Sequence, residues 1–175
     1  MVTLRRLEPA DAARFHALRL RGLREAPTAF GSSYEEECDT PVTAVAERMA
    51  KNTDGFILGA FEDGTLVGVV GIQRERHLKR AHKLVLWGMY VLGGVRGRGV
   101  GRQLVDEALR LGFALPGVRQ VILGVNASNV PALALYQAAG FTSFGLERAC
   151  MIVEGELQDE VHMVCVRPAR EGRIQ

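Results

Sequence analysis

The sequence predicts one α/β domain over residues 1–175, built as three layers in which helices flank a mixed (α+β) sheet. Two observations predict this class. Segments with the apolar spacing of strands alternate with segments that have the spacing of helices along the chain. A strand–helix–strand unit near the middle predicts a locally parallel pair of strands within that mixed sheet. The length of 175 residues suits a single hydrophobic core.

The N-terminal third is predicted to form one strand and two helices. Residues 2–6 are the expected strand, and Asp11 is a candidate N-cap for the first helix. The apolar positions of that helix recur at roughly helical spacing, at Ala12, Phe15, Leu18 and Leu23. Thr40 and Pro41 are the expected N-cap and first-turn proline of a second helix, which continues to about Ala50.

A β-hairpin and a further strand are predicted next. Two apolar runs, 56–61 and 66–72, flank the turn sequence Glu-Asp-Gly-Thr at 62–65. The basic and irregular segment 73–83 is expected to be a loop, and residues 84–91 are expected to form a strand.

A long amphipathic helix is predicted to begin at Val100. Its apolar stripe is formed by Val100, Leu104, Ala108 and Leu111. Pro116 and Gly117 end it, and residues 121–125 form a short apolar strand. A last helix begins at a cap, Ser128 or Asn129, and ends before Gly140 in the C′ position. The tail is expected to hold three strands, near 141–146, 149–153 and 160–166.

The bulk composition excludes several classes of protein. The net charge of +2 is too small to indicate nucleic-acid binding. The three cysteines, Cys38, Cys150 and Cys165, lack CxxC spacing, which argues against a disulfide framework and a zinc site and fits a reducing cytoplasm. We expect Cys150 and Cys165 to be small core residues. No segment approaches the roughly 20 apolar residues of a membrane span, so a cytoplasmic protein without metal or membrane contact is predicted.

Residues 96–101, Arg-Gly-Arg-Gly-Val-Gly, connect a strand to the long helix. Helix N-termini present unpaired N–H groups and a partial positive charge, and glycines let a ligand approach the backbone. Arg96, Arg98 and Arg102 add positive charge around the same loop. The pattern therefore favours an anion site, with a diphosphate as its natural ligand. By itself it also fits a flexible connection with capping glycines.

Two other phosphate-binding motifs do not fit this segment. A P-loop requires a lysine after the second glycine, and although Gly94 and Gly99 have the right spacing, Val100 follows them. A dinucleotide fingerprint requires GxGxxG, and the third glycine is missing whether the motif starts at Gly97 or at Gly99.

The segment resembles the Arg/Gln-x-x-Gly-x-Gly signature of the GNAT superfamily of acetyl-CoA-dependent N-acyltransferases. Residues 126–141, NASNVPALALYQAAGF, are similar to its second signature, and both occur in the family's order. The resemblance implies a mostly antiparallel sheet with a central, splayed parallel pair and acetyl-CoA in the gap. It also implies a set of cofactor-binding residues: Met89, Tyr90, Val91, Arg96, Gly97, Arg98, Gly99, Val100, Gly101, Arg102 and Asn129.

Asn129 and Tyr136 are seven residues apart, so they lie on one helix face, roughly 10 Å apart along the axis. Ala132 between them has a small side chain, which leaves room for an elongated ligand along that face. The resemblance implies that Tyr136 is catalytic and points at the sulfur of acetyl-CoA. Because a phenol is a weaker acid than a thiol, hydrogen-bond donation to the developing thiolate is expected rather than full proton transfer. Asn129 either contacts the cofactor or only caps its helix.

The sequence assigns no general base that would take a proton from the acceptor amine. Ribosomal-protein N-terminal acetyltransferases carry a glutamate in a similar stretch where this sequence has Gly124. The acidic run Glu35–Glu37 is expected to be a solvated face or a helix start, and His77 and His82 to lie solvated in a polar loop. A water chain to a backbone carbonyl is an equal alternative.

These patterns predict an N-acetyltransferase that moves the acetyl group of acetyl-CoA to a primary amine by direct attack, with a small molecule as acceptor. A protein N-terminus or lysine is the alternative acceptor. A third alternative is a non-catalytic acyl-CoA-binding regulatory domain. The resemblance also allows a homodimer.

Overall fold

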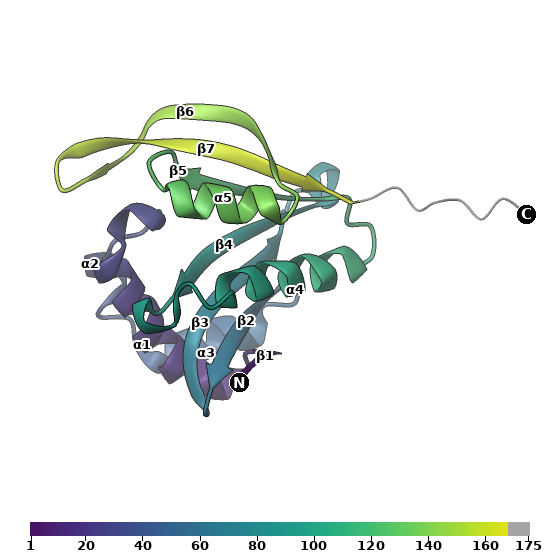
Figure 1. Ribbon diagram of the computed structural model, residues 1–175. Coiled ribbons are helices and arrows are strands. Elements are labelled where there is room, and N and C mark those ends of the chain that lie inside the picture. Colours follow the sequence, from purple (N-terminus) through teal and green to yellow (C-terminus); the bar gives the residue numbers. More distant parts are fainter. Residues whose placement is uncertain (168–175) are drawn as a thin grey trace, which may run out of the picture.

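In the computed structural model, residues 1–167 are described, and they contain one seven-stranded sheet with the strand order β1-β2-β3-β4-β5-β7-β6. Its strands are β1 Val2–Arg6, β2 Gly55–Glu62, β3 Thr65–Arg74, β4 Lys83–Val91, β5 Gln120–Asn126, β6 Thr142–Val153 and β7 Glu156–Val166. The β4–β5 pair is parallel, and the other neighbours are antiparallel. The predicted mixed, mostly antiparallel sheet with one parallel pair is confirmed (Figure 1).

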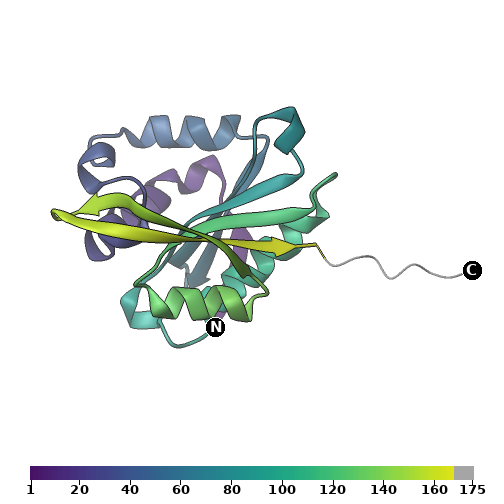
Figure 2. The same ribbon diagram turned by 90° about the horizontal axis from the view of Figure 1, so that it is seen from above.

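Helices cover both faces of this sheet, which gives the predicted three layers (Figure 2). One face carries α1 Ala12–Glu25, α2 Tyr34–Glu37 and α3 Val42–Lys51, and the other carries α4 Val100–Ala114 and α5 Val130–Ala138. Successive strand residues point to opposite faces. Leu58 and Val70 therefore join the core under α4, whereas Ile57 and Val69 join the core under α1. No helix within residues 1–167 is long and apolar enough to cross a membrane.

The hairpin between β2 and β3 turns where the sequence predicted. Asp63 and Gly64 have φ values of 48° and 77°, the paired positive values that a tight two-residue hairpin requires. A second turn of the same kind joins β6 to β7, with φ of 50° at Glu154 and 83° at Gly155. The last strand was predicted to begin at residue 160, whereas β7 begins at Glu156, so this tight turn was not predicted.

The predicted division of residues 141–153 into two strands is wrong. Both parts belong to the single strand β6, which carries register shifts against β7 between Ser143 and Gly145 and between Glu147 and Met151. Ala149 has a φ of 51° within the second shift. A bulge thus interrupts the apolar alternation without ending the strand, because β6 is an edge strand. Cys150 on this strand is partly exposed, which corrects its assignment to the core, whereas Cys165 is buried as expected.

Two predicted helix caps also need correction. Asp11 precedes α1, but its carboxylate does not cap it. It accepts two 2.7 Å hydrogen bonds from the Arg5 guanidinium and one of 2.9 Å from the Glu8 backbone N–H. The N-cap of α3 is Pro41 rather than Thr40, so the helix begins one residue later than predicted.

Candidate functional site

The parallel strands β4 and β5 separate soon after they begin. They are paired only at Lys83–Gln120, Leu84–Val121 and Val85–Ile122. Residues 86–91 of β4 remain paired only with β3, and the register of that pair shifts between Val69 and Gly71 of β3. Gly88 lies in this bulge with a φ of 62°, which a glycine adopts without strain. The gap between the strands opens between the two helices α4 and α5 (Figure 1).

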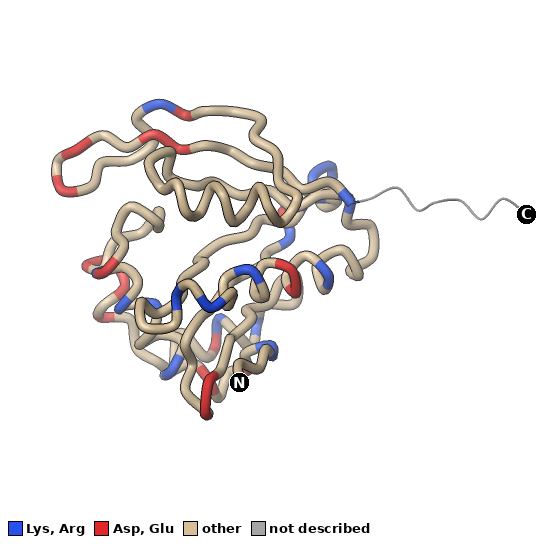
Figure 3. The backbone as a smooth tube through the Cα atoms, viewed as in Figure 1, with Lys and Arg blue, Asp and Glu red and all other residues tan. Residues whose placement is uncertain are grey.

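The glycine-rich segment that connects β4 to α4 contains two glycines in the left-handed backbone conformation. Gly97 has a φ of 75°, and Gly99, the N-cap of α4, has a φ of 78°. The side chain of Val100 is buried, and the first backbone N–H groups of α4 lack partners within the helix, as at any helix N-terminus. Basic residues, all of them arginines, are gathered along this loop and the start of α4 (Figure 3).

A cleft of about 410 Å³ lies between this loop and α5. We call it the coenzyme cleft, after the ligand that the sequence predicts for it. The predicted residues that line it are Met89, Tyr90, Val91, Arg96, Gly97, Gly99, Val100, Gly101, Arg102 and Asn129. Ala132, which was expected to leave room for a ligand on this helix, also lines it. Residues that the sequence did not single out complete the lining: Ala26, Ala29, Pro131 and Leu135. Ala132 is three residues after Asn129 and four before Tyr136, so helical spacing places it on the same face as both.

The three arginines of the loop have different partners. Arg96 Nε donates a 2.9 Å hydrogen bond to the carbonyl oxygen of Val91, which ties the loop to the end of β4. Arg98 is absent from the cleft lining, because its guanidinium pairs with Glu62 at the β2–β3 turn. Arg102 lines the cleft and pairs with Asp106 one helical turn later, at 2.7 Å. Arg96 is therefore the arginine that faces the cleft without a carboxylate partner among residues 1–167.

Tyr90 differs from its neighbours on β4. Its hydroxyl donates a hydrogen bond to Glu25 of α1, and its ring packs 6.3 Å from that of Phe30. Burial and the contact with this carboxylate raise the pKa of Tyr90 to about 12. Its side chain thus ties α1 to the sheet, and the Arg96 guanidinium lies 5.6 Å from the centroid of its ring.

A smaller pocket of about 100 Å³ continues from the coenzyme cleft into the gap between β4 and β5. We call it the thioester pocket. Its lining includes Gly88 from the bulge, Gly124 from β5, and both Asn129 and Tyr136 from α5. The two α5 side chains thus share one face, as their spacing predicted.

Tyr136 is 6% exposed and packs edge-on against Phe141, with ring centroids 5.7 Å apart. Burial raises the pKa of its phenol above the ordinary value, so the hydroxyl stays protonated at neutral pH. Asn129 caps α5, because its side-chain oxygen accepts a 3.2 Å hydrogen bond from the Ala132 N–H. It also lines both the cleft and the pocket, so the cap and a ligand contact are compatible.

Residues 20–141 match the acetyltransferase (GNAT) family. The chain belongs to this family. The N-alpha-acetyltransferase RimI of Mycobacterium tuberculosis is 37% identical over 118 residues, which cover 66% of this chain and 69% of that protein. The prediction of a GNAT acetyltransferase is therefore confirmed.

Solved GNAT structures share the fold at low sequence identity. An acetyltransferase of Streptococcus pneumoniae superposes with a TM-score of 0.83 at 24% identity, covering 95% of this chain and 100% of that one. A phosphinothricin acetyltransferase of Sinorhizobium meliloti, solved with acetyl-CoA, has a TM-score of 0.81 at 20% identity, with coverage of 94% and 88%. The GNAT fold is thus shared over nearly the whole chain.

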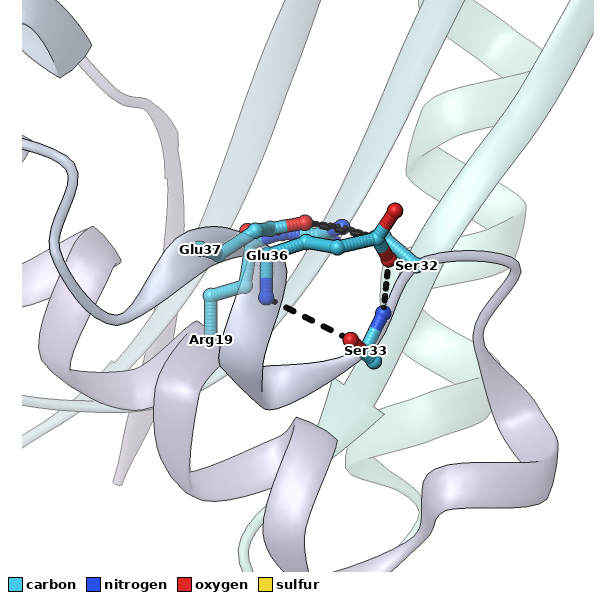
Figure 4. A network of polar contacts seen from close by, with 5 residues as sticks. All are labelled: Arg19, Ser32, Ser33, Glu36 and Glu37. Atoms are coloured by element: carbon cyan, nitrogen blue, oxygen red, sulfur yellow. Dashed lines mark hydrogen bonds and ion pairs between the residues drawn. The ribbon is translucent and has the colours of Figure 1, made fainter.

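The acidic run of this acetyltransferase forms the short helix α2. Glu36 and Ser33 form a capping box, in which the Ser33 N–H donates to Glu36 at 2.7 Å and the Glu36 N–H donates to Ser33 Oγ at 3.3 Å (Figure 4). The expected helix start is confirmed. Glu35 is exposed, but Glu37 is not solvated as expected, since Arg19 and Ser32 bind its carboxylate. His77 is exposed and His82 is half-buried beside the turn Leu78–Arg80.

A second large cleft lies on the α2 side of the GNAT sheet, with a volume of about 610 Å³. We call it the acceptor cleft, and it runs between α2 and the turn that joins β6 to β7 (Figure 1). Its lining carries the carboxylates of Glu35, Glu36 and Glu154. In Figure 3, acidic residues are gathered both at α2 and at the β6–β7 turn. Arg24 is a cation in this lining and stacks 3.9 Å above the Tyr34 ring.

Glu147, Cys150 and Glu160 also lie together, with their side-chain donor atoms within 4.8 Å of one another. We assign no metal to them, because exposed carboxylates gather in this way without an ion and Glu147 already contacts His162 Nε2 at 3.0 Å. The expectation that the enzyme needs no metal stays a prediction.

Proposed function

We propose that the protein transfers the acetyl group of acetyl-CoA to the primary amine of a small, cationic molecule. The observation that carries this proposal is the lining of the acceptor cleft, in which three carboxylates outnumber one guanidinium. A cleft of about 610 Å³ has the size of a small-molecule site. Its net negative charge attracts an ammonium group and would repel a carboxylate or phosphate.

The coenzyme cleft has the chemistry that coenzyme A requires. The diphosphate would be held by the N–H groups at the start of α4 and by the guanidinium of Arg96. The pantetheine arm would lie along α5 at Ala132, where the side chain is small. When bound, acetyl-CoA supplies the acetyl group as a thioester, which is activated toward an amine. The bulge at Gly88 leaves backbone groups of β4 without partners on β5, and these would orient that group.

Tyr136 would act in the thioester pocket, whose lining it forms with Gly88 and Gly124. Burial keeps its hydroxyl protonated, so it can donate a hydrogen bond to the sulfur that leaves. Full proton transfer from this phenol is disfavoured, because its raised pKa makes it a weaker acid than a thiol. The enzyme thus contributes chiefly by positioning two substrates and stabilising the charge on sulfur.

A protein N-terminus is the second candidate acceptor, and the similarity to the N-alpha-acetyltransferase RimI favours it. The two acceptors differ in what the acceptor cleft must admit. A peptide has to extend out of the cleft past the β6–β7 turn, whereas a small amine is contained between that turn and α2.

The decisive experiment measures free-thiol release from acetyl-CoA with a panel of spermidine, tyramine, glucosamine and a hexapeptide that begins with alanine. We expect turnover with a cationic small amine and weaker turnover with the peptide. Acetyl-CoA alone should raise the melting temperature, since it binds the folded state. Turnover restricted to the peptide would replace the first candidate by the second, and no melting shift at saturating acetyl-CoA would reject both.

A further inference from the structure

Attack on a thioester requires a neutral amine, and a cationic acceptor arrives as an ammonium ion that must lose a proton. We infer that the carboxylate of Glu160 takes this proton, and that Gly124 provides the space in which it does so. The inference rests on the proposed function. It is carried by the packing of these two residues across β5 and β7.

Glu160 occupies the position in which a side chain at residue 124 would lie. A Cβ atom built on Gly124 would be 2.1 Å from Oε1 of Glu160, 2.3 Å from its Cδ and 2.8 Å from its Oε2. All three distances are far shorter than a van der Waals contact. The carboxylate therefore lies directly over the Gly124 backbone, and only a glycine at this position lets it do so.

Both residues lie on the acceptor side of the sheet. Leu123 and Val125 of β5 and Met163 of β7 point into the core beneath α4 and α5. Gly124 lies between Leu123 and Val125 on β5, so it faces the side of the sheet away from α4 and α5. Glu160 is an odd number of residues, three, before Met163 on β7, so it faces that same side. Gly124 also lines the thioester pocket together with Tyr136. The carboxylate thus contacts the wall of the pocket in which the amine must meet the thioester.

Three other carboxylates near the acceptor side are engaged elsewhere, whereas Glu35 and Glu154 line the acceptor cleft itself. Glu36 closes the capping box of α2, and Glu37 is bound by Arg19 and Ser32. Glu147 contacts His162 Nε2 at 3.0 Å. The Glu160 side chain is 21% exposed, and the groups that face it in the described chain are His162, with Nδ1 at 3.8 Å, and Glu147 and Cys150 on β6. None of these is a lysine or arginine that would hold its charge in an ion pair.

The proposed step moves one proton of the ammonium to Glu160 and a second one to the departing sulfur. The N–H bond of the ammonium breaks and its proton passes to a Glu160 oxygen, which later returns it to water. The freed lone pair forms the C–N bond while the C–S bond breaks, and the sulfur departs with the second proton of the amine. No oxidant, reductant or further reactant is required.

The test compares Glu160→Gln with wild type on the amine that turns over fastest in the panel named above. We expect kcat/KM at pH 7 to fall on the order of 10²-fold, as is typical when a general base is removed. The deficit should shrink as the pH rises toward the pKa of the free amine, because the variant depends on amine that is already neutral. The Kd of acetyl-CoA should be unchanged.

Two further variants sharpen this test. Gly124→Ala displaces only the flexible end of Glu160, so it should keep its melting temperature and lose activity as Glu160→Gln does. Glu147→Gln is the matched control, because it removes a neighbouring carboxylate that does not contact Gly124, and it should keep its activity. The inference is overturned if Glu160→Gln is as active as wild type, or if Glu147→Gln loses as much. A wild-type protein without turnover refutes the proposed function itself, and the inference falls with it.

Discussion

Arg19 of α1 forms a bidentate ion pair with Glu37 of α2. Its Nε and Nη2 each donate a 2.6 Å hydrogen bond to the Glu37 carboxylate, and Ser32 Oγ donates a third of 2.6 Å (Figure 4). The Arg19 guanidinium also lies 5.7 Å from the centroid of the Trp87 ring on β4. This network therefore connects the helix that lines the acceptor cleft to the strand that carries the bulge.

We expect Glu37→Gln to lower the free energy of unfolding by about 1.5–3 kcal/mol, the range for hydrogen bonds to charged groups. Burial raises the pKa of this carboxyl, but Arg19 and Ser32 outweigh burial and hold the pKa below its ordinary value. A lowered folded-state pKa gives stability that is present above the unfolded pKa and is lost as the pH falls through the folded-state pKa. Denaturant unfolding from neutral to acidic pH measures both effects.

Glu35→Gln is the matched control for this prediction, since Glu35 is exposed on the same helix. It should leave the unfolding free energy and its acid dependence unchanged. Equal losses in the two variants would show that the charge of α2, rather than the contact with Arg19, provides the stability.

Tyr136→Phe removes the hydroxyl from the thioester pocket and leaves the ring against Phe141. We expect kcat to fall on the order of 10²-fold, as when one hydrogen-bond donor to a developing charge is lost. Binding of acetyl-CoA, measured by calorimetry, should be nearly unchanged. An unchanged kcat would remove Tyr136 from the mechanism.

Asn129→Ser separates the two roles of this residue. Serine caps helices as well as asparagine does, so the melting temperature should be kept. If the side chain also binds the cofactor, the Kd of acetyl-CoA should rise roughly 2- to 10-fold, the equivalent of one hydrogen bond. Asn129→Ala should add a loss of about 1 kcal/mol in stability from the missing cap. A serine variant with wild-type affinity would leave Asn129 as a cap alone.

Gly99→Ala tests the left-handed N-cap of α4. With a φ of 78°, an alanine here is strained even though the space around it is open. We expect a loss of about 1–2 kcal/mol in unfolding free energy, together with weaker binding of acetyl-CoA, because relief of the strain turns the N–H groups of the loop. Gly94→Ala is the control, since it lies in the same connection with open space and without a positive φ. Similar losses in both variants would contradict the role of the left-handed turn.

The sequence by itself determined the features that depend on local spacing. Most of the strands and helices before β6, the positive-φ turn at Asp63 and Gly64, and the shared face of Asn129 and Tyr136 follow from residues a few positions apart. The glycines before α4 likewise line the coenzyme cleft, as their position at a helix start predicts. Such patterns can be read locally because backbone geometry repeats every two or every 3.6 residues.

Only the tertiary structure decided which side chains meet across the sheet. Arg98 turned out to pair with Glu62, 36 positions earlier, and Tyr90 with Glu25, 65 positions earlier. Glu160 lies over Gly124 because β7 is inserted between β5 and β6 rather than placed after β6. No spacing rule connects residues so far apart, since their meeting depends on strand order and register, which the packing of the whole core sets.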